Sequence, residues 1–539
     1  MPYSELMKKG SILFFLLLVS TGIPVFTQNM LVRGVVVDAE YHTPVPYAAL
    51  FIQGFPVGTL ADNVGEFSFA VPDSLSGKQL MIARDGFQLM SLSLDEHYTE
   101  ELIVALQPQE HMDEIRALQD SIAESSGKFG VFLSKVVQFV ENDWIPLGDA
   151  ETNRFDLGRI QTFPTYNPIE GIRLRAGFAS NSRLSPHFFV NGYVAYGFID
   201  KKIKYRGEAV YSFNKKAYHE DEFPKNNLRL AYENDLYSPG DMHPFVMNDL
   251  LLITIRRAKN EATYRNFAEI NYEREHKNGL AYTLKVRRSR FVPQGKLQFN
   301  RDFEEGKVLT SNKLNTADVG LLLRYSVREA YDQQKRKRIP LAMTLPVFFL
   351  SHTIGINNFM GGEVAYHRTD FSAQKRFLLR GIGRLDVVGD VMKVWDKVPF
   401  PLLVYPNQRF RHRIENNFFF LNRSLEFVAD EQYTLRMTFV GDDLLLAKIP
   451  IADLLQIREL LSLRAAYGRL SDKNNPEVSP DGLYRFPAVS HQYDNVPYIE
   501  GTIGITNILG LLRVEYVHRF TYRDHPNALR GAFRVDVTL

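Results

Sequence analysis

The stretch YNPIEGIRLRAGF, residues 166–178, alternates apolar and charged side chains. One parity holds Ile172, Leu174, Ala176 and Phe178, and the cations Arg173 and Arg175 lie between them. Successive side chains of a β-strand point to opposite faces of the sheet. The stretch therefore predicts a strand with one apolar face and one charged face.

The same alternation recurs over the C-terminal two thirds of the chain, at residues 203–213, 315–327, 499–506, 513–522 and 533–539. A soluble β-sandwich alternates too. The polar parity here is rich in Arg, Lys and Glu, which suits a hydrated lumen, and the apolar parity is rich in Tyr and Phe, which suits membrane interfaces. After the N-terminus no apolar run approaches the roughly 20 residues of a spanning helix, and in lipid a closed barrel satisfies the strand backbone.

We therefore expect an all-β chain in which residues 166–539 form a transmembrane antiparallel β-barrel. A spanning strand needs about 9–11 residues, which gives roughly 14–16 strands. The longer polar stretches, 215–227, 301–316 and 470–497, are expected to be loops.

The charged parity supplies the candidate functional residues, as the expected lining of the lumen. They are Arg173, Arg175, Lys204, Arg206, Glu208, Arg513, Glu515, Arg519, Arg534 and Asp536. Two interpretations stay open: these charges line an open passage, or they form a static salt-bridge network that closes it.

The N-terminus has the pattern of an export signal. Lys8 and Lys9 precede an apolar run at 12–19, and Val25-Phe26-Thr27 is a plausible cleavage site, so residues 1–27 are predicted to be a signal peptide. The chain has no cysteine, which excludes disulfides, thiolate metal sites and a cysteine nucleophile.

Residues 28–106 show short Val/Ile/Phe-rich runs separated by Asp, Pro, Gly and Asn turn signals. Gly34, Gly58-Thr59, the turn Asp62–Phe67 and Asp85-Gly86-Phe87 together resemble the carboxypeptidase-regulatory-like family. That resemblance implies a small, seven-stranded, transthyretin-like β-sandwich without catalytic activity. In the barrel context we expect it in the periplasm.

Residues 107–165 are expected to be a partly helical linker. Met112, Ile115, Leu118 and Ile122 have helical spacing, and VFLSKVVQFVENDWIPLG (131–148) is a candidate second helix. The alternative is a segment that folds into or under the mouth of the next domain.

The composition and motifs exclude several classes of function. Lys and Arg total 64 against 62 Asp and Glu, which argues against nucleic acid as a partner. No P-loop, HExxH or GxSxG motif is present, and Ser351 and His352, adjacent on a strand, point oppositely. We predict no enzyme, cofactor or metal site. The run Lys335–Arg338 is either a solvated turn or a contact with lipid phosphates.

The barrel half resembles Bacteroidetes-type outer-membrane proteins of uncharacterised function that carry an N-terminal carboxypeptidase-regulatory-like domain. The resemblance rests on residues 166–178, 192–205, 336–350, 361–377, 383–407, 424–439, 448–460 and 497–522. The region between the two domains is shorter here than in that family. The resemblance implies a location and a fold rather than a reaction.

The leading hypothesis is a pore, transport or anchoring component of the outer membrane. Its expected partners are outer-membrane lipid and a periplasmic or outer-membrane protein bound through residues 28–106. The first alternative is an outer-membrane assembly or export factor, and the second is a barrel-embedded lipid- or glycan-active enzyme.

Overall fold

In the computed structural model the chain separates into two compact units, residues 1–126 and 127–539. The structure describes residues 29–537 with gaps, the longest of which are 108–143, 238–260 and 407–418. The predicted signal peptide and the proposed linker helix at 112–122 lie outside the described residues. In the described part of the chain, no helix is long and apolar enough to cross a membrane.

Unit 1 contains seven strands among its described residues, in two sheets. The three-stranded sheet has the order β4-β1-β7 and the four-stranded sheet β3-β2-β5-β6. Their bounds are β1 Asn29–Asp38, β2 Ala49–Ile52, β3 Gly58–Leu60, β4 Glu66–Pro72, β5 Gln79–Ala83, β6 Met90–Ser93 and β7 Leu102–Leu106.

One apolar cluster joins the two sheets of unit 1. Val36 and Val104 of the first sheet are fully buried together with Leu50 and Ile82 of the second. β1 pairs with β7 in parallel, and a Cβ at Gly34 would meet the Leu102 carbonyl oxygen at 2.0 Å. The close approach of these two strands therefore requires glycine at position 34.

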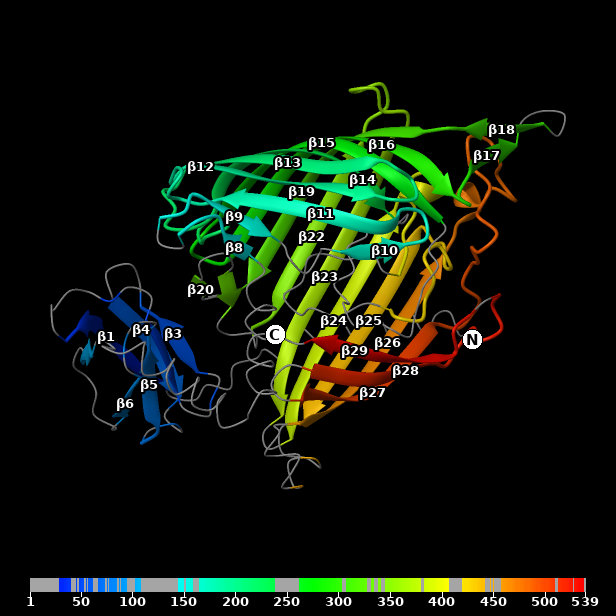
Figure 1. Ribbon diagram of the computed structural model, residues 1–539. Coiled ribbons are helices and arrows are strands. Elements are labelled where there is room, and N and C mark those ends of the chain that lie inside the picture. The colour runs from blue at the N-terminus through cyan, green and yellow to red at the C-terminus, as the bar shows by residue number, and fades with distance from the viewer. Residues whose placement is uncertain are drawn as a thin grey trace, which may run out of the picture. The chain divides into compact units, whose positions relative to one another are not determined.

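Unit 2 is built on a long antiparallel meander in which each strand pairs with the next. Its described strands are β11 Gly171–Ser180, β12 Phe188–Gly197, β13 Ile203–Ser212, β14 Asn226–Tyr237, β15 Glu261–Glu275, β16 Leu280–Gly295, β19 Leu314–Ser326, β22 Val347–Gly355, β23 Tyr366–Leu379, β24 Gly383–Val394, β25 Glu431–Gly441, β26 Arg458–Arg469, β27 Tyr498–Ile508, β28 Leu512–Arg519 and β29 Gly531–Val537. Figure 1 shows the sheet curling along this order, from the cyan strands through green and yellow to red.

Short strands from the expected linker belong to the same sheet. They are β8 Trp144–Pro146, β9 Phe155–Gly158 and β10 Thr165–Asn167. β9 and β10 pair with the free edge of β11, and β8 pairs with β9. The expectation of helix up to residue 148 is wrong for Trp144–Pro146, because the strand pairing of Ile145 with Leu157 overrides a weak helical periodicity.

The two faces of this sheet have opposite polarity. Apolar side chains of the predicted parity are solvent-exposed, among them Ile172 (55%), Ile203 (59%) and Ile503 (63%). Charged side chains on the other parity are buried, including Arg173 and Lys204. We call these the apolar face and the charged face. A soluble protein places them the other way round.

The connections between strands differ in length at the two ends of the meander. At one end, here end A, three connections have only three or four residues, at 276–279, 380–382 and 509–511. At the opposite end B, the connections 395–430 and 470–497 are the longest. Of the predicted loops, 215–227 and 470–497 fall mainly between strands. The stretch 301–316 instead contains a hairpin, β17 Phe299–Asp302 with β18 Val308–Ser311, and the start of β19.

The connections at end B have an apolar core of their own. It gathers Phe299 of β17, Phe400 and Leu403 around the short 3-10 helix Phe400–Leu402, Val428 and Tyr484. The rings of Phe299 and Tyr484 stack at 4.9 Å. End B is therefore a packed layer of interlocked loops.

Candidate functional site

The first candidate residues lie in a buried network at the start of the meander. Arg173 donates to both carboxylate oxygens of Asp235 on β14, each at 2.7 Å, and Tyr193 also donates to Asp235 at 2.5 Å. Lys204 lies 2.7 Å from Glu170 and 2.6 Å from Asp200. Every charge named here except Asp200 is almost completely buried, so each has been desolvated and then paired.

A second network continues along β13 and β14. Arg206 donates to Glu233 at 2.7 Å and to Glu208 at 2.6 Å, and Arg229 also pairs with Glu208. Arg175, the remaining cation of the opening stretch, stacks on Tyr193 at 3.8 Å from the ring centroid. The candidates of β11 and β13 are thus brought together.

The C-terminal candidates form a separate network on β28 and β29. Glu515 accepts from Arg513 at 2.7 Å and from Arg534 at 2.5 Å. Arg519 pairs with Glu426 at 2.6 Å. Asp536 lies in β29, opposite Arg513 in the strand register, and its side chain is outside the described part of the structure.

Glu426 belongs to a segment for which the sequence predicted no functional residue. Residues 419–430, here called the inner segment, lie in the connection between β24 and β25 and pack on the charged face of β26–β29. Phe420 and Leu421 cluster with Val517, and Phe419 and Phe427 cluster with Tyr498.

Polar contacts fix the inner segment at both of its ends. The peptide N–H groups of Phe420 and Leu421 donate to Glu500 at 2.7 and 3.0 Å. Farther along, Glu426 accepts from Arg519 and lies 3.0 Å from His525. The segment therefore occupies space that an open lumen would leave to water.

Two arginines on neighbouring strands, one of which contacts the inner segment, are incompletely paired. Arg436 of β25 and Arg464 of β26 lie directly opposite each other in register, and both are buried. Arg436 contacts Asp390, and Arg464 donates to Thr502 at 2.8 Å. In the described part of the chain, Nε and Nη1 of Arg436 and Nε and Nη2 of Arg464 have no hydrogen-bond acceptor.

The ring of Phe420 covers Arg464 of β26 and Arg534 of β29. The guanidinium carbons of Arg464 and Arg534 lie 4.7 and 4.1 Å from its centroid. Such cation–π contacts are strongest where water is excluded. The inner segment thus shields two cations that would otherwise face the interior.

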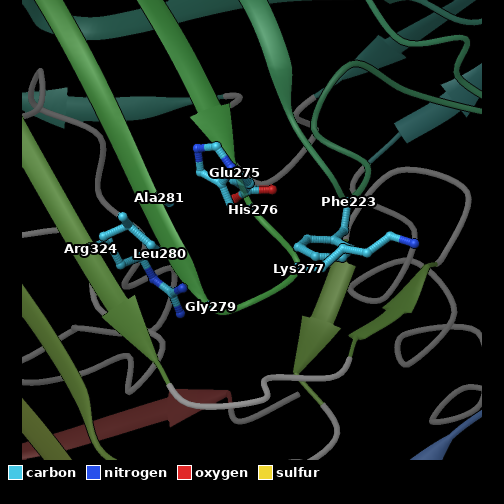
Figure 2. Close-up of a pocket in the computed structure, with 8 residues that line it drawn as sticks. All are labelled: Phe223, Glu275, His276, Lys277, Gly279, Leu280, Ala281 and Arg324. Carbon is cyan, nitrogen blue, oxygen red and sulfur yellow. The ribbon is translucent and has the colours of Figure 1, made fainter.

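A shallow depression lies at end A around the β15–β16 turn. Figure 2 shows its lining, which comes from Phe223, residues 275–277 and 279–281, and Arg324. Arg338, the last residue of the basic run, donates to Glu275 at 2.7 and 2.5 Å. Lys335–Lys337 lie outside the described residues, so a lipid contact of the run stays a prediction.

The loop 213–225 at the same end holds a buried amine. Lys216 donates to the carbonyl oxygens of Glu222 and Pro224 at 2.6 and 3.0 Å. Burial lowers the pKa of Lys216 to about 8, against the opposing effect of Glu222.

The described residues contain no group of three or more His, Asp or Glu side chains that could hold a metal ion. His352 lies 3.0 Å from the hydroxyl of Thr369 on the neighbouring strand. The acidic partners of the predicted cations, such as Asp235, Glu233 and Glu426, were missed because contacts between distant segments are not visible in one sequence.

Comparison with known proteins finds one family model that matches part of the chain. Residues 149–390, less than half of the chain, match the family described as "Family of unknown function (DUF5686) C-terminal domain". A search of curated proteins gave no match. The family match begins ahead of β9 and so includes strands that were expected to be linker.

Several solved structures are similar at low identity. BamA from Haemophilus ducreyi lacking POTRA domains 1–3 is 9% identical, with 70% of this chain and 69% of that chain covered and a TM-score of 0.43. CdiB from Acinetobacter baumannii is 11% identical, with 69% and 58% covered and a TM-score of 0.35. The outer membrane protein OprD from Pseudomonas aeruginosa is 10% identical, with 71% and 90% covered and a TM-score of 0.30. At these TM-scores the similarities do not decide a role.

Proposed function

We propose that unit 2 is an outer-membrane β-barrel, and that it forms a passage that is closed at rest. The observation that carries this proposal is the inverted polarity of the sheet. Ile172, Ile203 and Ile503 are exposed, whereas Arg173, Lys204 and Arg519 are buried and paired. Only a solvent that is apolar outside the sheet makes this arrangement favourable.

Aromatic side chains on the apolar face support the membrane placement. Near end A, a row runs from His187 through Tyr211, Phe213 and Tyr272 to Tyr282, with neighbouring ring centroids 5.2 to 6.4 Å apart. Near end B, Tyr196, Phe198, Trp395, Tyr433 and Phe520 are exposed. Two aromatic belts are typical of the two interfaces of a bilayer.

The strand length between the belts also fits a bilayer. Ile203 and Tyr211 lie near opposite ends of β13, eight residues apart. At 3.3 Å per residue this is about 26 Å along the strand, or about 20 Å along the membrane normal at a strand tilt of about 40°, of the same order as the roughly 25 Å apolar band of outer-membrane barrels.

Connection lengths suggest the orientation. Outer-membrane barrels have short periplasmic turns and longer extracellular loops. End A, which has the three shortest connections, is then periplasmic, and end B, which has the two longest, is extracellular. Unit 1, with its seven strands and its resemblance to carboxypeptidase-regulatory-like domains, would serve as a periplasmic interaction module.

The passage is proposed to be closed because the charged face is paired and the inner segment packs on it. β11 and β29 share no register in the described residues, and β9 and β10 occupy the free edge of β11. Closure of the barrel is thus assigned to these short strands together with β29.

Reconstitution tests the proposal. Purified protein in lipid vesicles should migrate differently with and without heating, and strands β11–β29 should resist added protease. Tags inserted at Ser182 and at Val478 should be accessible from opposite sides of the vesicle. Protein that stays in the aqueous phase, or tags that are cleaved from the same side, would contradict it.

A further inference from the structure

The inner segment covers an arginine patch that it does not neutralise. Arg436 and Arg464 are directly opposite each other on adjacent strands, where side chains approach to about 5 Å and like charges repel. Two nitrogens of each guanidinium lack an acceptor in the described part of the chain. A buried donor without an acceptor is destabilising, so folding stability does not account for these two arginines.

We infer that Arg436, Arg464 and Arg534 form an anion-binding patch, and that anionic solutes cross the barrel when the inner segment is displaced. This inference rests on the proposed barrel and names the chemistry of its solute. A guanidinium group binds carboxylate and phosphate through parallel hydrogen bonds. The solute class is therefore small molecules that carry a carboxylate or a phosphate.

The charge balance of the wall supports an anionic solute. When the inner segment leaves, Glu426 leaves with it. Among the charged positions named so far, the face beneath it then carries five arginines against four carboxylates: Arg436, Arg464, Arg513, Arg519 and Arg534 against Asp390, Glu500, Glu515 and, at the register position opposite Arg513, Asp536. An excess of fixed cations in a narrow passage raises the local concentration of anions.

Glu500 provides the alternative contacts that displacement requires. It lies opposite Arg464 in the β26–β27 register, but its carboxylate accepts the two peptide N–H groups of the inner segment. The nearest Arg464 nitrogen is 4.0 Å away. When the segment leaves, Glu500 can pair with Arg464. This new ion pair lowers the free-energy cost of losing the two hydrogen bonds from the peptide N–H groups of the segment.

Two substitutions should release the inner segment while all three arginines of the patch stay in place. Glu426→Gln removes the charge that pairs with Arg519, and Phe420→Ala removes the ring that covers Arg464 and Arg534. In planar bilayers with a potassium chloride gradient, the native protein should be silent. The double variant should conduct, with a reversal potential that reports chloride permeating faster than potassium.

Further variants assign the selectivity to the patch. In the conducting background, Arg464→Gln together with Arg436→Gln should bring the chloride-to-potassium permeability ratio toward one. Arg287→Gln is the matched control, because Arg287 of β16 pairs with Glu269 of β15, outside the strands of the patch, and its loss should leave the ratio unchanged. Inorganic phosphate should reduce the chloride current only when the patch is intact.

A reversible lock tests the role of the segment itself. The chain has no native cysteine, so Leu421→Cys and Val517→Cys, which replace two residues of one buried cluster, give a single thiol pair. In the conducting background, oxidation should abolish the current and reduction should restore it. A current that is unaffected by oxidation would overturn the assigned role of the inner segment.

The outcomes separate this inference from the proposed function. A double variant that inserts and shows heat-dependent migration but is silent, or that prefers potassium, overturns the inference and leaves the barrel intact. A native protein that does not insert into bilayers overturns the proposed function itself.

Discussion

Arg464 and Glu500 face each other across adjacent strands, but they do not form a close salt bridge, since 4.0 Å separates their nearest charged atoms. Glu500 instead binds the peptide N–H groups of Phe420 and Leu421 and the hydroxyl of Tyr498. The carboxylate is thus well satisfied, whereas the arginine is not. The peptide N–H groups of the inner segment thus occupy the Glu500 carboxylate that would otherwise pair with Arg464 across the strands.

This asymmetry predicts unequal effects of substitution. Glu500→Gln should lower the free energy of unfolding by about 1.5–3 kcal/mol, because it removes the charge of the buried acceptor that binds the peptide N–H groups of Phe420 and Leu421. Arg464→Met should change it by less than about 1 kcal/mol, since an apolar chain of similar length removes unpaired donors. Urea unfolding in detergent micelles measures both. Equal losses would show that Arg464 is better paired than its contacts indicate.

Asp235 is expected to be essential to the first network. Asp235→Asn removes the negative charge that accepts the two shortest Arg173 hydrogen bonds and leaves the buried cation with its longer contacts to Glu170, at a cost of about 3–5 kcal/mol. The control is Arg485→Gln, whose partner Asp302 lies in an exposed pair and whose loss should cost much less. If the two variants unfold at the same urea concentration, the buried network does not stabilise the sheet.

Ile503 should contact lipid. It is 63% exposed in the middle of β27, and Ile503→Arg should cost about 2–4 kcal/mol of stability in vesicles, as expected for a cation near the bilayer midplane. Val478→Arg is the control, because Val478 is also apolar and exposed, at 57%, but lies in a loop at end B. Tolerance of arginine at position 503 would place β27 outside the membrane.

The buried amine of Lys216 should make the free energy of unfolding depend on pH in the alkaline range. Its pKa of about 8 in the folded protein is below its ordinary value of 10.5. Between these values the unfolded chain binds more protons, so stability rises with pH from 8 to 10.5, by at most about 3 kcal/mol. The difference in unfolding free energy between the native protein and Lys216→Met, followed over this range, isolates the contribution. A flat difference would mean that the amine is hydrated.

A substitution in the core of unit 1 should destabilise unit 1 without destabilising the sheet of unit 2. Ile82→Ala should destabilise unit 1 by about 2–5 kcal/mol, because Ile82 is fully buried. Ile103→Ala, at a side chain that is 74% exposed, should have little effect. Hydrogen exchange of the full chain should show faster exchange in β1–β7 and no change in β11–β29.

The alternation of side chains was sufficient to predict the strands and their faces. In β13, Ile203 and Tyr211 are exposed while Lys204 and Ser212 are buried, in the parity expected from the sequence. A strand keeps a strict period of two wherever its faces meet different surroundings. The pairing partners of the charges were not predictable, because Arg173 and Asp235 are joined only through the order of the strands.

The inner segment escaped prediction for a different reason. The sequence NNFFFLNRSLEF, residues 416–427, has no period of two, and its apolar residues give no sign of what they pack against. Their surroundings come from β26–β29, which follow later in the chain. The short strands β8 and β9 were missed because three or four residues are too few to show a period.

The contacts within the meander and the contacts of the inner segment should form at different stages of folding. Each strand of the meander can pair with its predecessor as soon as the hairpin between them closes. Phe420, however, lies 80 residues before its acceptor Glu500, and Glu426 lies 93 residues before Arg519. Contacts of such separation form late. A nascent chain therefore carries an exposed cluster of phenylalanines until its last three strands are in place, and it needs protection from aggregation during that interval.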